Sequence, residues 1–149
     1  MIKTKWNERF IRLAREIGTW SSCIRNNRQV GCVIVKNNRV MTTGYNGAPA
    51  GVKSCVERNE CLREKNHIES GTRAEVCYSV HAEQNARIQA AKLGISLDGA
   101  ELYCTHQPCS LCSKMIINSG IKWIYFEQGY PDQFSIDLLN EAGVELIKL

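Results

Sequence analysis

The stretch from residue 81 to residue 127, HAEQNARIQAAKLGISLDGAELYCTHQPCSLCSKMIINSGIKWIYFE, decides the fold. Two segments with helical composition, each closed by a glycine, alternate in it with two short apolar segments typical of strands. The predicted elements are a helix over 81–93, a strand over 100–105, a helix over 108–119 and a strand over 122–127. This alternation indicates an α/β protein in which helices pack on one sheet.

The flanking segments extend the pattern in both directions. Apolar residues at helical spacing precede two valine-rich runs that are separated by the turn-forming residues 36–38. The further predicted elements are a helix over 5–18, hairpin strands over 29–35 and 39–45, a helix over 134–142 and a strand over 144–149. A hairpin followed by alternating elements predicts a mixed sheet with helices on its faces, in three layers.

Length and composition predict one globular domain over residues 1–149. Hydrophobic residues make up 44% of the chain and charged residues 23%, which is typical of a protein with a packed core. The formal charge of +4 suits a small anionic ligand and is far below that of duplex-binding proteins. No apolar run is long enough for a membrane span, and residues 1–6 lack the apolar stretch of a secretory signal. We therefore expect a cytoplasmic protein without membrane association.

Eight cysteines in 149 residues are the most informative feature of the composition. A reducing cytoplasm disfavours disulfides, so metal ligation or catalysis is the better explanation for most of them. Residues 46–80 lack periodicity and are rich in glycine, charge and cysteine. A loop of that length within a small domain is usually functional or held by a metal.

Two short motifs carry the chemistry, HAE at 81–83 and PCSLC at 108–112, and each begins a predicted helix. Pro108 suits the first helical position, because its missing N–H would be unpaired there. Cys109 and Cys112 are three residues apart, so one helical turn brings both sulfurs toward the same ion. The positive end of the helix favours both thiolates.

His81, Cys109 and Cys112 therefore form a candidate zinc site. Three protein ligands leave a fourth tetrahedral position for water, as in catalytic rather than structural sites, and zinc lowers the pKa of such a water toward neutrality. Glu83, two residues from the histidine, is placed to move protons. These are the parts needed for hydrolytic release of ammonia from an amino-substituted ring.

Each motif alone also has a structural explanation. A histidine at a helix start often caps the helix, a CxxC pair often holds a structural metal, and a first-turn carboxylate such as Glu83 favours the helix dipole. The ordered combination of H-x-E and P-C-x-x-C is the known signature of zinc nucleobase deaminases. It favours the catalytic interpretation.

From about Trp6 to its C-terminus the chain resembles the cytidine and deoxycytidylate deaminase superfamily. Besides the zinc motifs, the likeness lies in VGCVIV at 30–35, GYNGAP at 44–49 and SGIK at 119–122. The GYNG segment points to the deoxycytidylate branch. The resemblance implies a three-layer α/β/α cytidine-deaminase-like fold with a mixed five-stranded sheet and helices on both faces. It also implies conversion of dCMP to dUMP with loss of ammonia, supplying thymidylate synthesis, often in a homohexamer.

The resemblance also implies roles for individual residues. Asn46 would contact the sugar or phosphate, although Asn46-Gly47 also reads as a turn, and the backbone of Ala82 would meet the pyrimidine edge. Arg25 matches a phosphate-binding arginine, whose planar fork suits a phosphomonoester. Arg28 is a rival because the local spacing is longer than usual in the family. Tyr130 resembles a phosphate-contacting tyrosine, or packs as a loop aromatic.

Four cysteines flank or lie in the irregular segment: Cys23, Cys55, Cys61 and Cys77. Their spacing is not that of a standard zinc finger, but four thiolates would form a closed zinc site and order a long loop. The resemblance supports this second, structural zinc, since several phage and bacterial relatives hold one in these regions. His67 is an alternative ligand, although a solvated loop histidine is the simpler interpretation.

The other two cysteines, Cys32 and Cys104, lie in apolar strands and are expected to pack in the core. His106 precedes the second zinc motif and is expected in the pocket wall.

Two other functions fit parts of the sequence. Another deaminase on the same scaffold would act on free cytidine, a guanine-like base or a tRNA adenosine, but residues 141–149 lack the basic character that a tRNA substrate requires. A non-catalytic zinc-stapled module would bind nucleic acid. This second function does not explain the HAE motif at 81–83, and the chain lacks the interleaved aromatic and basic residues that stack on bases. We therefore expect a nucleotide substrate and no stable nucleic-acid binding.

Overall fold

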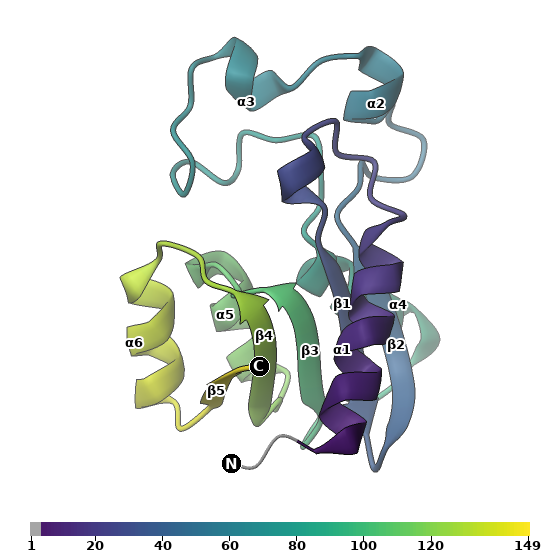
Figure 1. Cartoon of the computed structure of the whole chain (residues 1–149), viewed down its shortest axis with the longest axis vertical. Coiled ribbons are helices and arrows are strands. Elements are labelled where there is room, and N and C mark those ends of the chain that lie inside the picture. Colours follow the sequence, from purple (N-terminus) through teal and green to yellow (C-terminus); the bar gives the residue numbers. More distant parts are fainter. Residues whose placement is uncertain (1–3) are drawn as a thin grey trace.

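The computed structural model describes residues 4–149 and contains one five-stranded sheet in the order β2-β1-β3-β4-β5 (Figure 1). The strands are β1 (Gly31–Lys36), β2 (Arg39–Tyr45), β3 (Glu101–His106), β4 (Trp123–Gln128) and β5 (Glu145–Lys148). β1 runs antiparallel to β2 and β3, whereas β3, β4 and β5 are parallel to one another. The predicted mixed sheet is confirmed. Residues 1–3, part of the segment in which a secretory signal was sought, lie outside the described residues.

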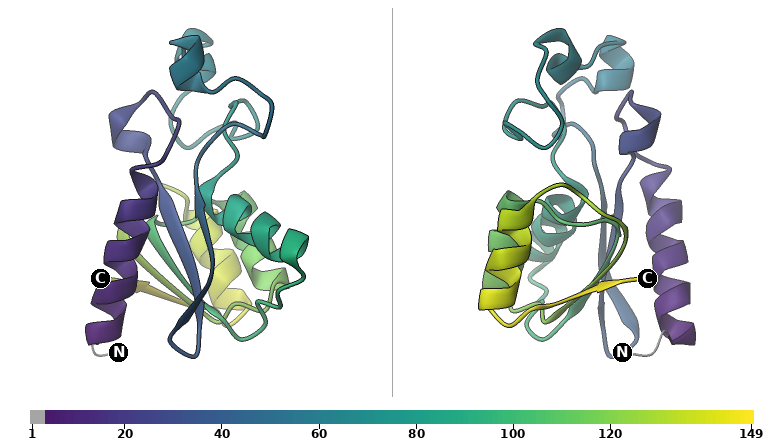
Figure 2. Two further views of the ribbon diagram at one scale, coloured as in Figure 1. Left: turned by 90° about the vertical axis from the view of Figure 1, so that its right-hand side faces the viewer. Right: turned by 60° about the vertical axis from the view of Figure 1, so that its left-hand side comes forward.

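Helices cover both faces of the sheet, so the predicted three-layer α/β/α arrangement is also confirmed (Figure 2). The helices are α1 (Lys5–Gly18), α4 (Ala82–Leu93), α5 (Ser110–Asn118) and α6 (Gln133–Glu141). α1 packs Phe10 and Ala14 against Val33 and Tyr103 on one face. The other three helices bury a separate apolar cluster on the opposite face. Among the described residues no helix combines the length and the apolar character that crossing a bilayer demands.

Local signals fix several ends of these elements. Asn37 and Asn38 adopt φ of 52° and 57°, the left-handed values of a tight hairpin turn between β1 and β2. Gly94 caps α4 at φ 68°. At the start of β1 the chain passes so close to α1 that a Cβ on Gly31 would lie 1.9 Å from the carbonyl oxygen of Ala14. Only glycine permits this contact between two backbones.

Residues 46–80 form no strand of the main sheet, but they contain two short helices that the sequence did not predict. These are α2 (Cys55–Arg58) and α3 (Leu62–Lys65), and a third unpredicted element, a 3₁₀ turn at Asn26–Arg28, precedes β1. A single helical turn has no periodicity to detect. α2 and α3 lie beyond the end of the sheet to which β3 and β4 point (Figure 1). That end is where open α/β sheets bind their ligands.

Candidate active site

The two predicted zinc motifs meet at this end of the sheet. His81 and Cys109 are the residues immediately before α4 and α5, and both have extended backbones, with φ/ψ of −67°/154° and −75°/171°. Cys112 lies in the first turn of α5. The prediction that Pro108 is the first helical residue is therefore wrong, because Pro108 precedes the extended Cys109 and the helix begins at Ser110. Cys109, extended just before α5, and Cys112, in the first turn of α5, both bring their sulfurs close to His81.

The three donor atoms have the separations that a tetrahedral metal requires. His81 Nδ1 lies 3.5 Å from Cys109 Sγ and 3.3 Å from Cys112 Sγ. Bonds of about 2.0–2.1 Å to nitrogen and 2.3 Å to sulfur put two tetrahedral ligands roughly 3.5 Å apart. Within residues 4–149 these are the only three histidine, cysteine or acidic side chains whose ligand atoms all lie within 4.8 Å of one another. The donor set fits zinc.

Protonation at the two sulfurs is strongly unequal. The pKa of Cys109 is lowered to about 4, first by the hydrogen bond from Cys112 and then by that from His81. The pKa of Cys112 is raised well above its usual value by the same hydrogen bond and by burial. Cys109 is therefore the sulfur of the pair that loses its proton more readily, and metal binding requires deprotonated ligands.

Glu83 lies beside these ligands in the first turn of α4 and is only 5% exposed. Burial raises the pKa of its carboxyl group, and the positive charge of His81 opposes that rise. A buried carboxyl group with a raised pKa can carry a proton near neutral pH, which is the property of a general acid/base.

A single pocket gathers nearly all the residues that the sequence singled out. Its lining includes Cys23, Arg25, Arg28, Asn46, Cys55, Cys61, Cys77, His81, Ala82, Glu83, Cys109 and Tyr130. Cys112 is buried behind it with an exposed fraction of 1%. His106 also lines the pocket, whereas His67 is exposed and does not. The pocket therefore joins the candidate zinc site to several arginines.

The model of the cytidine and deoxycytidylate deaminase zinc-binding region matches residues 4–128, most of the chain. The chain belongs to the cytidine and deoxycytidylate deaminase family. The resemblance seen in the sequence is thereby confirmed, and so is membership of an enzyme family that binds zinc.

Named relatives include several deoxycytidylate deaminases. The chain is 38% identical over 131 residues to that of Mycobacterium phage D29, a match that covers 85% of this chain and 97% of the phage protein. It is 37% identical over 145 residues to that of Schizosaccharomyces pombe, covering 97% of this chain but only 44% of the longer yeast protein. The crystal structure of dCMP deaminase from the cyanophage S-TIM5 in complex with dCMP and dUMP superposes with a TM-score of 0.79 at 34% identity. That superposition covers all of both chains.

In this deaminase-family chain the two candidate phosphate arginines have different surroundings. Arg25 Nε lies 3.2 Å from the carboxylate of Glu64, an ion pair at the pocket rim. Arg28 donates a hydrogen bond to Ser70 Oγ. Burial lowers the pKa of His106 and raises that of Tyr130, and the charge of Arg28 adds to the first shift and opposes the second. Within the part of the chain that the structure describes, no carboxylate pairs with Arg28, whereas Arg25 is paired with Glu64.

Asn46 uses its whole amide group to hold the backbone that carries Arg28. Its Oδ1 accepts from the N–H of Val30 at 2.9 Å, and its Nδ2 donates to the carbonyl oxygen of Arg28 at 2.6 Å. It lines the pocket, as expected for a substrate contact, but both ends of its amide are engaged within the protein. Asn46 therefore holds the backbone at Arg28, and its predicted contact with the substrate stays a prediction.

The four remaining pocket cysteines face one another across the irregular segment. All are free thiols, and Cys55 is 3% exposed. Its pKa is raised first by burial and then by the nearby sulfurs of Cys77, Cys23 and Cys61. They are close enough to interact electrostatically, but they do not approach one another as closely as the active-site ligands do. Cys32 and Cys104, in contrast, are fully buried partners across β1 and β3 in the core.

Sequence reasoning missed several pocket residues from the irregular segment, above all Arg63 and Ser70. Neither belongs to a motif or to a periodic pattern. The one usable signal for Arg63 is its place two residues after Cys61, where a metal site would hold it next to the pocket.

Proposed function

We propose that this chain catalyses the zinc-dependent hydrolytic deamination of dCMP to dUMP, with release of ammonia. The observation that carries this proposal is the buried Glu83 carboxyl group beside the His81, Cys109 and Cys112 donor set, in a pocket that also contains arginines. The names of the phage and yeast relatives and the dCMP and dUMP complex of the cyanophage enzyme support the same substrate.

His81, Cys109 and Cys112 would hold the zinc, which lowers the pKa of a water molecule and so supplies a nucleophile at neutral pH. Glu83 takes up the proton that this activation releases and delivers it to the ring nitrogen of cytosine. After water has added to C4, Glu83 takes the proton of the new hydroxyl group and transfers it to the amino group, which leaves as ammonia while the C4 carbonyl forms. The N–H of Ala82, in the first turn of α4, has no acceptor within the helix and is available to the pyrimidine edge.

Arg28 reads the phosphate in this proposal, and Tyr130 contributes a second contact. Arg28 donates to Ser70 and lines the same pocket as Tyr130, and its planar fork can donate two hydrogen bonds to a phosphomonoester. Arg25 was the favoured candidate from the sequence. Its pairing with Glu64 sets a carboxylate beside it, which disfavours an incoming phosphate.

A second, structural zinc would be bound by Cys23, Cys55, Cys61 and Cys77. The mutual electrostatic influence of these thiols and their shared pocket support this ligand set. Four thiolates form a closed site without an open coordination position, so this ion would order the irregular segment and not take part in the reaction.

The family resemblance leads us to propose further that residues 1–149 form one domain, which assembles as a homo-oligomer, a hexamer, in the cytoplasm. Large apolar side chains on the outer helical layer remain exposed, including Ile88, Leu93, Leu111 and Phe134. Exposed apolar residues on one layer are suited to contacts between subunits. Sedimentation of the purified protein measures the assembly directly.

The test of the function is ammonia release by zinc-loaded protein with dCMP, deoxycytidine, cytidine, CMP and dCTP in parallel. The expected result is turnover of dCMP well above that of the nucleosides, with Glu83→Gln as the inactive control. Turnover of nucleosides alone would support the zinc chemistry but contradict the assignment of Arg28 and Tyr130 to the phosphate. Failure with every substrate by protein that holds zinc would overturn the proposal and point to a different amino-substituted ring or a polynucleotide.

A further inference from the structure

The loop from Glu69 to Val76, which we call the roof loop, closes the pocket on the side of Arg28. It contains neither helix nor strand, and Ser70, Gly71 and Ala74 line the pocket from it. Two of its residues have positive φ, 84° at Gly71 and 43° at Arg73. A loop of this kind needs contacts outside itself to keep one conformation.

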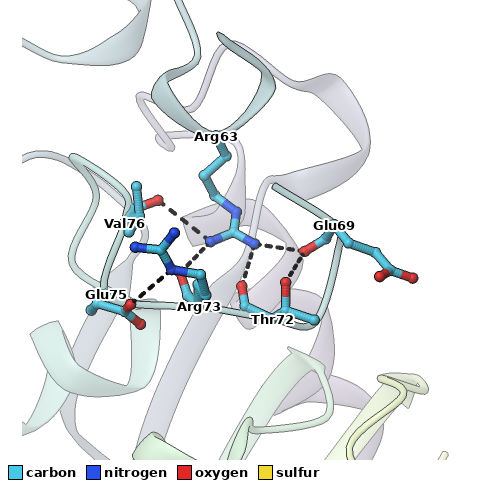
Figure 3. Close-up of polar contacts among 6 residues, drawn as sticks. All are labelled: Arg63, Glu69, Thr72, Arg73, Glu75 and Val76. Atoms are coloured by element: carbon cyan, nitrogen blue, oxygen red, sulfur yellow. Dashed lines mark hydrogen bonds and ion pairs between the residues drawn. The ribbon is translucent and has the colours of Figure 1, made fainter. Parts of the chain in front are cut away.

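Arg63, on α3, supplies these contacts through its guanidinium group (Figure 3). Its Nη2 donates to the carbonyl oxygens of Glu69 at 2.9 Å and Thr72 at 2.5 Å. Its Nη1 donates to those of Arg73 at 2.6 Å and Val76 at 3.4 Å. One side chain thus joins four main-chain carbonyls that span the whole roof loop.

This arrangement leaves Arg63 unavailable as a direct phosphate ligand. Four of the five guanidinium N–H groups are already used by the roof loop. A lysine could not replace it, because its three donors leave from a single nitrogen and cannot reach carbonyls in a planar fan.

The roof loop in turn contacts both residues that we assign to the phosphate. Ser70 Oγ accepts the hydrogen bond from Arg28. At the next residue, a Cβ on Gly71 would lie 3.9 Å from Tyr130 Oη and 3.6 Å from Pro131 Cγ, so the loop packs against that tyrosine. A displacement of the roof loop therefore moves the surroundings of Arg28 and Tyr130 together.

We infer that Arg63 is a positioning residue for substrate selection: it fixes the roof loop, and through Ser70 it fixes the orientation of Arg28 that favours a nucleotide over a nucleoside. This inference rests on the proposed function, since it presupposes that Arg28 meets the substrate phosphate. It assigns Arg63 no contact with the reacting atoms.

The experiment compares Arg63→Lys with Arg73→Gln, using dCMP and deoxycytidine as substrates. Both variants affect the roof loop, but the Arg73 side chain is exposed and, among residues 4–149, forms its ion pair with Glu75, so Arg73→Gln removes a charge without removing the four carbonyl contacts. For Arg63→Lys we expect the KM for dCMP to rise about tenfold or more, with kcat within roughly threefold of wild type, as for lost ground-state binding. The kcat/KM for deoxycytidine should stay within about twofold, and amides of the roof loop should exchange hydrogen faster. Arg73→Gln should behave as wild type.

A second variant, Ser70→Ala, tests the link to Arg28 while leaving every contact of Arg63 in place, and it serves if Arg63→Lys does not fold. It should raise the KM for dCMP by a smaller factor, about threefold, and leave deoxycytidine unaffected. The inference is overturned if Arg63→Lys keeps the wild-type preference for dCMP, if Arg73→Gln loses as much of it, or if Ser70→Ala changes nothing. A wild type that turns over both substrates equally contradicts the proposed function itself, which separates the two failures.

Discussion

The pocket contains two groups of candidate metal ligands, which the chain builds in different ways. His81, Cys109 and Cys112 lie at the starts of α4 and α5, over a buried core, and their ligand atoms already meet within 4.8 Å. The loop cysteines, which are Cys23, Cys55, Cys61 and Cys77, come from segments with little regular structure and do not approach one another as closely. The fold therefore arranges the first group by itself, whereas in our proposal a metal ion brings the sulfurs of the second group together.

The difference has a thermodynamic meaning. Ligands that helices and a sheet already position lose little entropy when a metal binds, so the free energy of binding is available as affinity. Ligands on loops lose their freedom at the moment of binding, and part of the binding free energy becomes folding free energy. Removal of the metal should therefore abolish catalysis at the first group of ligands and unfold the loop segment that carries the second group.

The largest expected effect comes from Glu83→Gln, which breaks the chemistry without disturbing either group of ligands. Acid/base catalysis of this kind contributes about 10²–10⁴-fold, so kcat for dCMP should fall at least by that factor. Zinc content and thermal unfolding should remain those of wild type. Glu141→Gln, at the exposed end of α6, is the matched control. Near-wild-type turnover by Glu83→Gln would contradict the proposed mechanism.

The next effect separates the two regions by pairing Cys112→Ser with Cys61→Ser. Wild type should bind about two zinc ions per chain, and each variant about one. Cys112→Ser should lose activity while residues 46–80 stay resistant to protease. Cys61→Ser should make that segment protease-sensitive while the remaining zinc stays at His81, Cys109 and Cys112.

Metal analysis and limited proteolysis of the same samples decide the outcome. If Cys61→Ser keeps the wild-type metal content, the loop cysteines hold no zinc and the comparison fails. Cys32→Ala, in the core and outside both sets of ligands, controls for the loss of a thiol.

A smaller effect is expected from alanine at a glycine in each region. At Gly44 a Cβ would lie 2.1 Å from the carbonyl oxygen of Ala82, so Gly44→Ala pushes α4 away from β2 and should destabilise the protein by about 1–3 kcal/mol. At Gly51 nothing lies within 4 Å, and only its φ of 82° penalises alanine, which should cost about 1 kcal/mol. Denaturant unfolding measures both. Equal losses of stability in the two variants would mean that the start of α4, next to Glu83, is no more tightly packed than the loop around Gly51.

The smallest effect should be that of His67→Ala, which tests whether the loop site uses a histidine. His67 is exposed and lies outside the pocket lining. Zinc content should therefore be unchanged, and kcat/KM for dCMP should stay within about twofold of wild type. Loss of one zinc equivalent would transfer a ligand role to His67 from one of the four cysteines.

The sequence predicted the region built on the sheet far better than the loops. A helix of several turns or a strand of several residues repeats its apolar spacing, and glycines such as Gly94 mark where helices end. These signals therefore predicted the bounds of these elements to within one or two residues. The zinc motif could be read because its ligands follow fixed local spacings. The irregular segment offered no such signal. Arg63 acts through backbone carbonyls, which every residue possesses, and no side-chain pattern identifies such contacts.

The close passage of Gly31 against α1 has a consequence for how the substrate is captured. The Cβ that Gly31 lacks would also lie 2.4 Å from the amide nitrogen of Gly18, so residues 19–30 leave and rejoin the body of the protein at nearly one point. The segment that bears Arg25 and Arg28 is thus a loop whose two ends are held together. The conformational entropy of closing this loop is lost during folding and is not lost again when a ligand binds. Calorimetry of nucleotide binding should accordingly find a small entropic penalty, and the free energy of binding should change little with temperature.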